Sequence, residues 1–270
     1  MQLIFTKSKW EMWDDSLEAF LRRARADGFD AVEIYLPAQP ESAREITARV
    51  ADHGLALVAQ INTEGPDAAA HVDSLERRFA FAVETTPLLI NSHTGRDWFS
   101  FEDNLRIFTR GCELAREHGI TFTNETHRSR PTASAADTRR YLEALPEMRL
   151  NLDFSHWFCV HESDLSDQPA SIEMAIGRGS HLHARVGFEE GPQVPDPLDP
   201  LWARWTQLHL DLWRRVLAAR QADGATCLTI TPEFGPPPYM PVEPGSGRPL
   251  ADAWEVNVRF RNWLSEQLNS

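Results

Sequence analysis

The stretch ADGFDAVEIYL, residues 26–36, carries the pattern from which the fold is predicted. A helix-like run ends in a polar residue and Gly28, and a β-rich apolar run follows almost directly. Glycine just past a helix end takes the left-handed conformation without a Cβ clash, so it closes the helix and turns the chain. The segment therefore predicts a junction from helix to strand.

The same junction recurs in DHGLALVAQI (52–61), EHGITFT (117–123) and ADGATCLTI (222–230). Apolar residues spaced three and four apart, as at Leu17, Phe20 and Leu21, predict amphipathic helices. Strands that alternate with helices imply right-handed crossovers and a parallel sheet. The candidate strands are eight short runs at 3–6, 31–36, 55–61, 88–91, 120–124, 148–152, 181–186 and 226–231.

Eight such units within 270 residues favour a closed (β/α)8 TIM barrel of the α/β class, formed by residues 1–270 as a single domain. An open, doubly wound sheet is the alternative, because periodicity does not reveal closure. The glycine-rich motifs GxGxxG and GxxxxGKS/T, which would favour an open nucleotide-binding sheet, are absent from the sequence. Two proline-rich segments, 192–200 and 232–248, are expected to form long loops at the barrel mouth.

Composition restricts the expected partners and compartment. The formal net charge of −13 argues against nucleic acid, because binding to phosphates needs a basic surface. The sequence has no apolar run near the roughly 18 residues of a membrane helix, and its first residues lack the features of a secretory signal. Three scattered cysteines argue against a disulfide framework or a zinc knuckle. We therefore expect a cytoplasmic protein, compatible with a homo-oligomer, that binds neither nucleic acid nor membrane.

Polar side chains able to do chemistry follow four consecutive strands of the expected barrel. They occur in TNETH (123–127), NLDFSH (151–156), HLHAR (181–185) and TPEF (231–234). The carboxyl ends of the strands form one rim of a TIM barrel, and active sites lie there. Carboxylates and imidazoles from four strands are therefore expected to meet at this rim.

The carboxylates of Glu125, Asp153 and Glu233 would repel one another at a buried rim unless a cation lay among them. With a histidine of the seventh strand they form a mixed oxygen and nitrogen set. This set suits one divalent ion, with Mn²⁺ preferred and Mg²⁺, Co²⁺ and Zn²⁺ as alternatives. Each residue alone has an ordinary structural explanation, such as helix capping by Asp153, but their convergence favours a metal site.

At these residues the chain resembles the xylose isomerase-like TIM-barrel superfamily of sugar isomerases and epimerases. The resemblance covers the general plan of the whole chain, and its specific motifs lie mainly between residues 90 and 240. It implies that one divalent metal is held by Glu125, Asp153, His183 and Glu233. It further implies that Glu125 and Glu233 also transfer protons, and that His156 of the motif DFSH contacts the substrate.

The match departs from the family in two places. The seventh strand also offers His181, and alternation along a strand points it the same way as His183, so either histidine could be the ligand. The family's epimerases place an arginine six residues after the ligand histidine, where this chain has Glu189. Arg185 could compensate, but the change leaves the substrate open.

Further polar residues near the rim are expected to contact the substrate. Glu33 and Gln60 are interpreted instead as interior polar residues, and Trp98, Trp157 and Tyr239 mainly as packing residues. The candidate substrate contacts are His93 and Arg96 in NSHTGRD (91–97), His127 after the fifth strand, and His181 and Arg185 on the seventh.

The predicted reaction is isomerisation or epimerisation of a sugar or keto-sugar. A proton would leave the carbon beside a carbonyl, and the metal would stabilise the resulting enediolate. The same groups suit β-elimination or hydration of a keto-sugar or keto-glycoside, so a lyase is the first alternative. An endonuclease IV-like phosphodiesterase and a non-catalytic sugar-binding subunit are the others.

Overall fold

The computed structural model describes residues 1–36 and 42–269, and its strands form a closed parallel barrel in the order β1 to β8. β1 lies beside β8, with Gln2 paired to Cys227 and Phe5 to Ile230, and this pairing closes the sheet. The predicted TIM barrel is confirmed and the open sheet is wrong. The strands are β1 (Gln2–Ser8), β2 (Ala31–Tyr35), β3 (Ala56–Asn62), β4 (Leu89–His93), β5 (Phe122–Glu125), β6 (Arg149–Leu152), β7 (Gly179–Ala184) and β8 (Cys227–Pro232).

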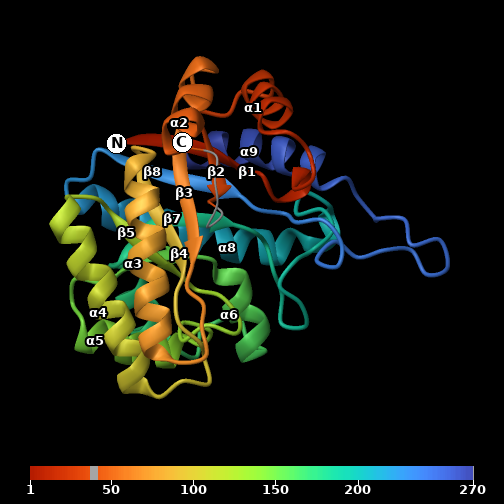
Figure 1. Cartoon of the computed structure of the whole chain (residues 1–270). Coiled ribbons are helices and arrows are strands. Elements are labelled where there is room, and N and C mark those ends of the chain that lie inside the picture. The colour runs from red at the N-terminus through yellow and green to blue at the C-terminus, as the bar shows by residue number, and fades with distance from the viewer. Residues whose placement is uncertain (37–41, 270) are drawn as a thin grey trace.

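Helices alternate with the strands and surround the barrel (Figure 1). None of the helices in the described part of the chain combines the length and the apolar character needed to cross a membrane. The helices are α1 (Leu17–Ala26), α2 (Ala43–Asp52), α3 (Ala68–Glu84), α4 (Phe101–His118), α5 (Ala135–Ala144), α6 (Phe154–His161), α7 (Pro169–Ile176), α8 (Ala203–Ala222) and α9 (Ala253–Asn269), with short 3-10 turns η1 (Trp10–Met12) and η2 (Pro200–Trp202).

The glycines of the repeated junctions behave as expected. Gly28, Gly54, Gly119 and Gly224 all adopt positive φ, from 63° to 81°, where a helix gives way to the next strand. Strand boundaries shift by one or two residues from the predicted runs. The largest difference is at β7, which begins at Gly179 rather than 181, because glycine and serine gave no β signal there.

Apolar side chains pack between the sheet and the helices, where Phe79, Phe108, Trp213 and Phe260 are at most 1% exposed. The interior of the barrel is by contrast strongly polar. Its buried residues include Thr6, Glu33, Asn91, Thr123, Asn151, His181 and Thr231. Hydrogen bonds between strands far apart in sequence, such as Asn91 to Glu33, join these side chains. The barrel therefore carries a buried polar network directly below the mouth.

The two predicted proline-rich loops, 192–200 and 232–248, lie beside each other. The amide of Gln193 donates to the Gly235 carbonyl at 3.0 Å and accepts from the Gly235 N–H at 2.8 Å. The segment between β8 and α9, blue in Figure 1, extends away from the barrel. This segment carries Glu233 and Tyr239 at its beginning, so the loop helps to build the mouth.

Candidate active site

The four side chains expected to hold a metal meet at the carboxyl ends of β5 to β8. Glu125, Asp153, His183 and Glu233 each offer one ligand atom, and these atoms all lie within 4.8 Å of one another. All four residues are buried. Asp153 also caps α6 by accepting a hydrogen bond from the Ser155 N–H at 3.0 Å. Asp153 is therefore both the N-cap of α6 and a member of the cluster.

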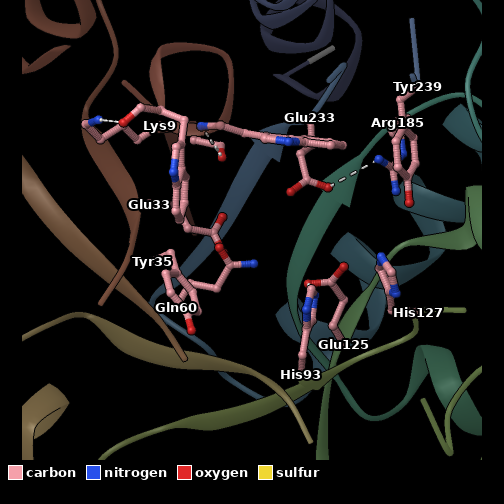
Figure 2. A pocket seen from close by; sticks show the side chains of 13 residues that line it. Lys9, Glu33, Tyr35, Gln60, His93, Glu125, His127, Arg185, Glu233 and Tyr239 are labelled. Atoms are coloured by element: carbon pink, nitrogen blue, oxygen red, sulfur yellow. Dashed lines mark hydrogen bonds and ion pairs between the residues drawn. The ribbon is translucent and has the colours of Figure 1, made fainter. Parts of the chain in front are cut away.

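A cavity of about 370 Å³ opens above this cluster. Figure 2 shows Glu233 and Glu125 directed toward one another across it, with Arg185, His127 and His93 along one side. Aromatic rings wall the cavity, and Trp10 meets Tyr239 edge to face with ring centroids 4.9 Å apart. The full lining is Ser8, Lys9, Trp10, Trp13, Glu33, Tyr35, Gln60, His93, Glu125, His127, Arg185, Glu233 and Tyr239.

His183 lies at the centre of the negative charge. Its Nδ1 lies 2.9 Å from Glu233 Oε2 and 3.4 Å from Glu125 Oε2, and its Nε2 lies 3.0 Å from Glu33 Oε2. Burial lowers the pKa of His183, but Glu233, Glu33 and Glu125 together raise it well above the ordinary value. A cation is thus strongly favoured at this point, either a proton on the ring or a metal ion beside it.

The donor set fits a divalent metal ion. Nδ1 of His183 has no hydrogen-bond partner among the described residues, and the oxygens nearest to it belong to carboxylates. A buried nitrogen left without a partner is costly, and coordination to a metal would satisfy it. Three carboxylates and one imidazole nitrogen form a set typical of Mn²⁺ or Mg²⁺, with Co²⁺ or Zn²⁺ also compatible.

The two histidines of β7 point the same way, as their alternation predicts, but they differ in surroundings. His181 places Nε2 3.3 Å from Glu33 Oε2, and its Nδ1 lies 2.6 Å from Thr229 Oγ1. The four-residue cluster around Glu125 contains His183 rather than His181. Geometry therefore favours His183 as the ligand.

Arg185 brings a second positive charge into the cluster. Its Nη2 donates to Asp153 Oδ2 and to His156 Nε2, the latter at 2.8 Å, and its Nη1 lies 3.8 Å from Glu233. Although burial lowers the pKa of Arg185, Asp153 and Glu233 raise it above the usual range. The pKa of Asp153 is about 6, because burial raises it more than Arg185 lowers it. The guanidinium therefore contacts residues of the acidic cluster and also borders the cavity.

The remaining candidate histidines pack ring against ring, tilted in one pair and edge to face in the other. The rings of His93 and His127 lie 4.6 Å apart, and those of His127 and His156 4.2 Å apart. Burial and His93 lower the pKa of His127 to about 3. His93 and His127 border the cavity, whereas His156 is completely buried in contact with Arg185 and is not among the described residues that line the cavity.

The structure changes two of the predictions from sequence, those for Arg96 and Tyr239, and agrees with a third, that for Trp157. Arg96 is not among the described residues that line the cavity, and its guanidinium packs over Trp98 at 5.2 Å from the ring centroid. Trp157 is fully buried and donates to the Thr132 carbonyl, so it packs as expected. Tyr239 lines the cavity instead of merely packing.

Glu33 is the functional candidate to which the sequence gave too little weight. It lies on β2, is 1% exposed, and contacts both histidines of β7. Gln60 also borders the cavity. A charged residue inside an otherwise apolar strand was the available signal, because a buried carboxylate needs a partner.

Comparison with known proteins identifies the family and supports the fold. A family model described as "Xylose isomerase-like TIM barrel" matches residues 21–191. The chain belongs to this family. The resemblance inferred from the strand ends is thereby confirmed, and a search of curated proteins gave no match.

Solved structures share the fold at low identity. A xylose isomerase-like TIM barrel protein from Mycobacterium smegmatis, solved in complex with magnesium, matches with a TM-score of 0.66 at 15% identity, covering 98% of this chain and 96% of that one. D-Psicose 3-epimerase from Clostridium cellulolyticum H10, solved with D-tagatose, matches at 0.54 and 15% identity, covering 98% and 95%. Endonuclease IV from Thermus thermophilus matches at 0.58 and 16% identity, covering 98% and 100%.

These structures include both an epimerase of sugars and a nuclease. At this identity they show the fold and leave the reaction open. The expected exclusion of nucleic acid, which rested on net charge alone, is therefore not supported.

Proposed function

We propose that the protein is a divalent-metal-dependent isomerase or epimerase of a sugar or sugar derivative. The observation that carries the proposal is the pairing of Glu125 and Glu233 across one cavity, each within reach of His183 Nδ1. Two carboxylates that face one substrate volume can remove a proton on one side and return it on the other. Epimerisation beside a carbonyl needs groups on both faces of the substrate, and isomerisation can use one or both members of the same pair.

Glu125, Asp153, His183 and Glu233 would hold the ion. When bound, a divalent metal supplies Lewis-acid stabilisation for negative charge that develops on a substrate oxygen. The protein's own groups keep Glu125 ionised: its Oε2 accepts from Asn91 Nδ2 at 3.0 Å and from Asn151 Nδ2 at 3.3 Å. Burial raises the pKa of Glu125, but His93 and His183 hold it well below the ordinary value.

The rest of the cavity suits substrate binding. Trp10, Trp13, Tyr35 and Tyr239 offer aromatic faces for the C–H surfaces of a sugar. His93, His127 and Gln60 offer polar atoms for hydroxyl groups. Arg185 orients Asp153 and His156 at the base. The same groups also serve a lyase, since both reactions begin with loss of the proton beside the carbonyl.

Elemental analysis of the purified protein, followed by a screen of aldo- and keto-sugars in D₂O, tests the proposal. We expect one ion per chain and one solvent deuterium at the carbon beside the carbonyl. Glu125→Gln and Glu233→Gln should each lower kcat by about 10²–10⁴-fold. The matched control is Glu64→Gln, which removes a carboxylate that is 54% exposed and paired with Arg78. Turnover with no deuterium in substrate or product would refute proton abstraction.

Phosphodiester cleavage is the second candidate, because a second group of potential ligands adjoins the first. His93, Glu125 and His127 also bring ligand atoms within 4.8 Å of one another, and Glu125 is common to both groups. Two or more ions per chain, with cleavage of an abasic-site DNA duplex and no sugar turnover, would favour this candidate. One ion per chain and no cleavage would exclude it.

A further inference from the structure

Glu33 accepts hydrogen bonds from two residues at the bottom of the cavity and also faces a ring nitrogen of each histidine of β7. Its Oε1 accepts from Asn91 Nδ2 at 3.0 Å, and its Oε2 accepts from Thr231 Oγ1 at 2.8 Å. Nε2 of His183 lies 3.1 and 3.0 Å from the two oxygens, and Nε2 of His181 lies 3.3 Å from Oε2. Both oxygens are thus surrounded by donors, although the residue is 1% exposed.

This arrangement determines which ring nitrogen of His183 carries the hydrogen. A carboxylate can only accept, so the nitrogen that faces Glu33 must carry the hydrogen, and that nitrogen is Nε2. In the neutral ring the lone pair then belongs to Nδ1. Nδ1 is the atom directed at Glu125 and Glu233, and it has no hydrogen-bond partner in the described chain. Glu33 therefore turns the lone pair of His183 toward the metal cluster.

Asn91 extends the influence of Glu33 to a second candidate ligand. Its Nδ2 donates to Glu33 Oε1 and to Glu125 Oε2, both at 3.0 Å. Its Oδ1 accepts from Thr123 Oγ1 at 3.3 Å, which fixes the amide with its NH₂ group toward the carboxylates. The positions of Glu33 and Glu125 are thereby coupled through one side chain.

We propose that Glu33 is a positioning residue that holds His183 by Nε2–H and, through Asn91, holds Glu125, so that both offer lone pairs to one cation. The inference rests on the metal site of the proposed function and assigns Glu33 no contact with the ion. Partners that orient a ligand histidine typically contribute 10–100-fold to metal affinity. Glu33 acts from the side of the ring opposite to Glu125 and Glu233.

The test is Glu33→Gln, which keeps the shape of the side chain but removes its charge and one acceptor. Titration of the metal-free protein with Mn²⁺, followed by calorimetry, should give a dissociation constant about 10–100-fold higher than wild type with the same stoichiometry. Glu64→Gln, the same chemical change at an exposed position, should leave the constant unchanged. Glu33→Asp keeps the carboxylate and should recover part of the affinity. It also serves as the second variant if Glu33→Gln does not fold.

A second readout needs no metal. ¹⁵N–¹H spectra of the metal-free protein should show a slowly exchanging Nε2–H on His183 that Glu33→Gln loses. Equal Mn²⁺ affinity in wild type and both Glu33 variants would overturn the proposal. So would complete loss of the ion in Glu33→Gln together with its retention in Glu233→Gln, because the ion would then be held by Glu33, His181 and His183. If wild type binds no Mn²⁺ but the Nε2–H signal depends on Glu33, the proposed metal site fails while the orientation of His183 by Glu33 stands.

Discussion

Replacement of Arg185 by methionine should destabilise the metal-free protein, and added metal should raise the stability of the variant by a comparable amount. The guanidinium is 1% exposed and donates to Asp153, to His156 and to Ser155 Oγ at 3.1 Å. It also lies 3.8 Å from Glu233. Methionine fills much of the same volume, so the change removes chiefly the positive charge and the donors. Two buried carboxylates are then left without this cation.

The expected loss follows from the cost of an uncompensated buried charge. Removing one partner of a buried ion pair costs about 3–5 kcal/mol. Arg185 borders the cavity, and water there can replace part of its interaction, so the lower end of about 3 kcal/mol is expected. Mn²⁺ at 100 times its dissociation constant should raise the free energy of unfolding of the variant by about 2.7 kcal/mol, and that of wild type equally at the same ratio, because binding to the folded state alone adds that amount.

Urea unfolding in EDTA and in excess Mn²⁺ measures both effects. The control is Arg139→Met, which removes an exposed i,i+4 pair with Glu143 and should cost between about 0 and 1 kcal/mol in either buffer. The double variant Arg185→Met with Asp153→Leu should be more stable without metal than Arg185→Met, since it no longer buries that unpaired carboxylate. A loss in EDTA no larger than that of the control would show that Arg185 does not neutralise the cluster, and the reasoning would fail.

Three further changes probe other parts of the structure. Asn257→Leu should lower the free energy of unfolding by about 2–3 kcal/mol and weaken Mn²⁺ binding. The side chain of Asn257 forms hydrogen bonds with both the N–H and the carbonyl of Phe234, next to Glu233. Unchanged urea unfolding would contradict this. His209 is buried with its pKa lowered to about 4 by desolvation, so the folded state binds fewer protons than the unfolded state between about pH 4 and 6.5. The contribution of His209 to the free energy of unfolding is complete above pH 6.5 and falls by up to about 3 kcal/mol as the pH drops toward 4. His209→Gln should remove this part of the pH dependence. Parallel curves of stability against pH for the two proteins would refute this prediction. Gly111→Ala should destabilise the protein by about 1–2 kcal/mol although alanine favours helix, because the new Cβ would lie 2.5 Å from Phe122 Cε1; a rise in Tm would show that the α4–β5 packing adapts.

Much of the barrel and its rim could be predicted from local sequence. Glycines such as Gly28 and Gly224 mark the helix ends by a steric rule that involves only their own backbone. Parallel strands bring their carboxyl ends to one rim, so Glu125, Asp153 and Glu233 could be placed together before any coordinates. These predictions held because each depends on the period and the direction of a single strand.

Only the tertiary structure decided which side chains face one another. Glu33 and His183 are 150 positions apart in sequence, and the closing of the barrel brings them to 3.0 Å. Alternation placed His181 and His183 on the same face, but the partners on β2, β5 and β8 distinguish them. Arg96 lies near the rim in sequence yet packs on Trp98, and Arg185 is turned into the acidic cluster. Strand periodicity determines the face of the sheet to which a side chain points. The side chains that it contacts depend on the register of strands distant along the chain and on the closure of the barrel.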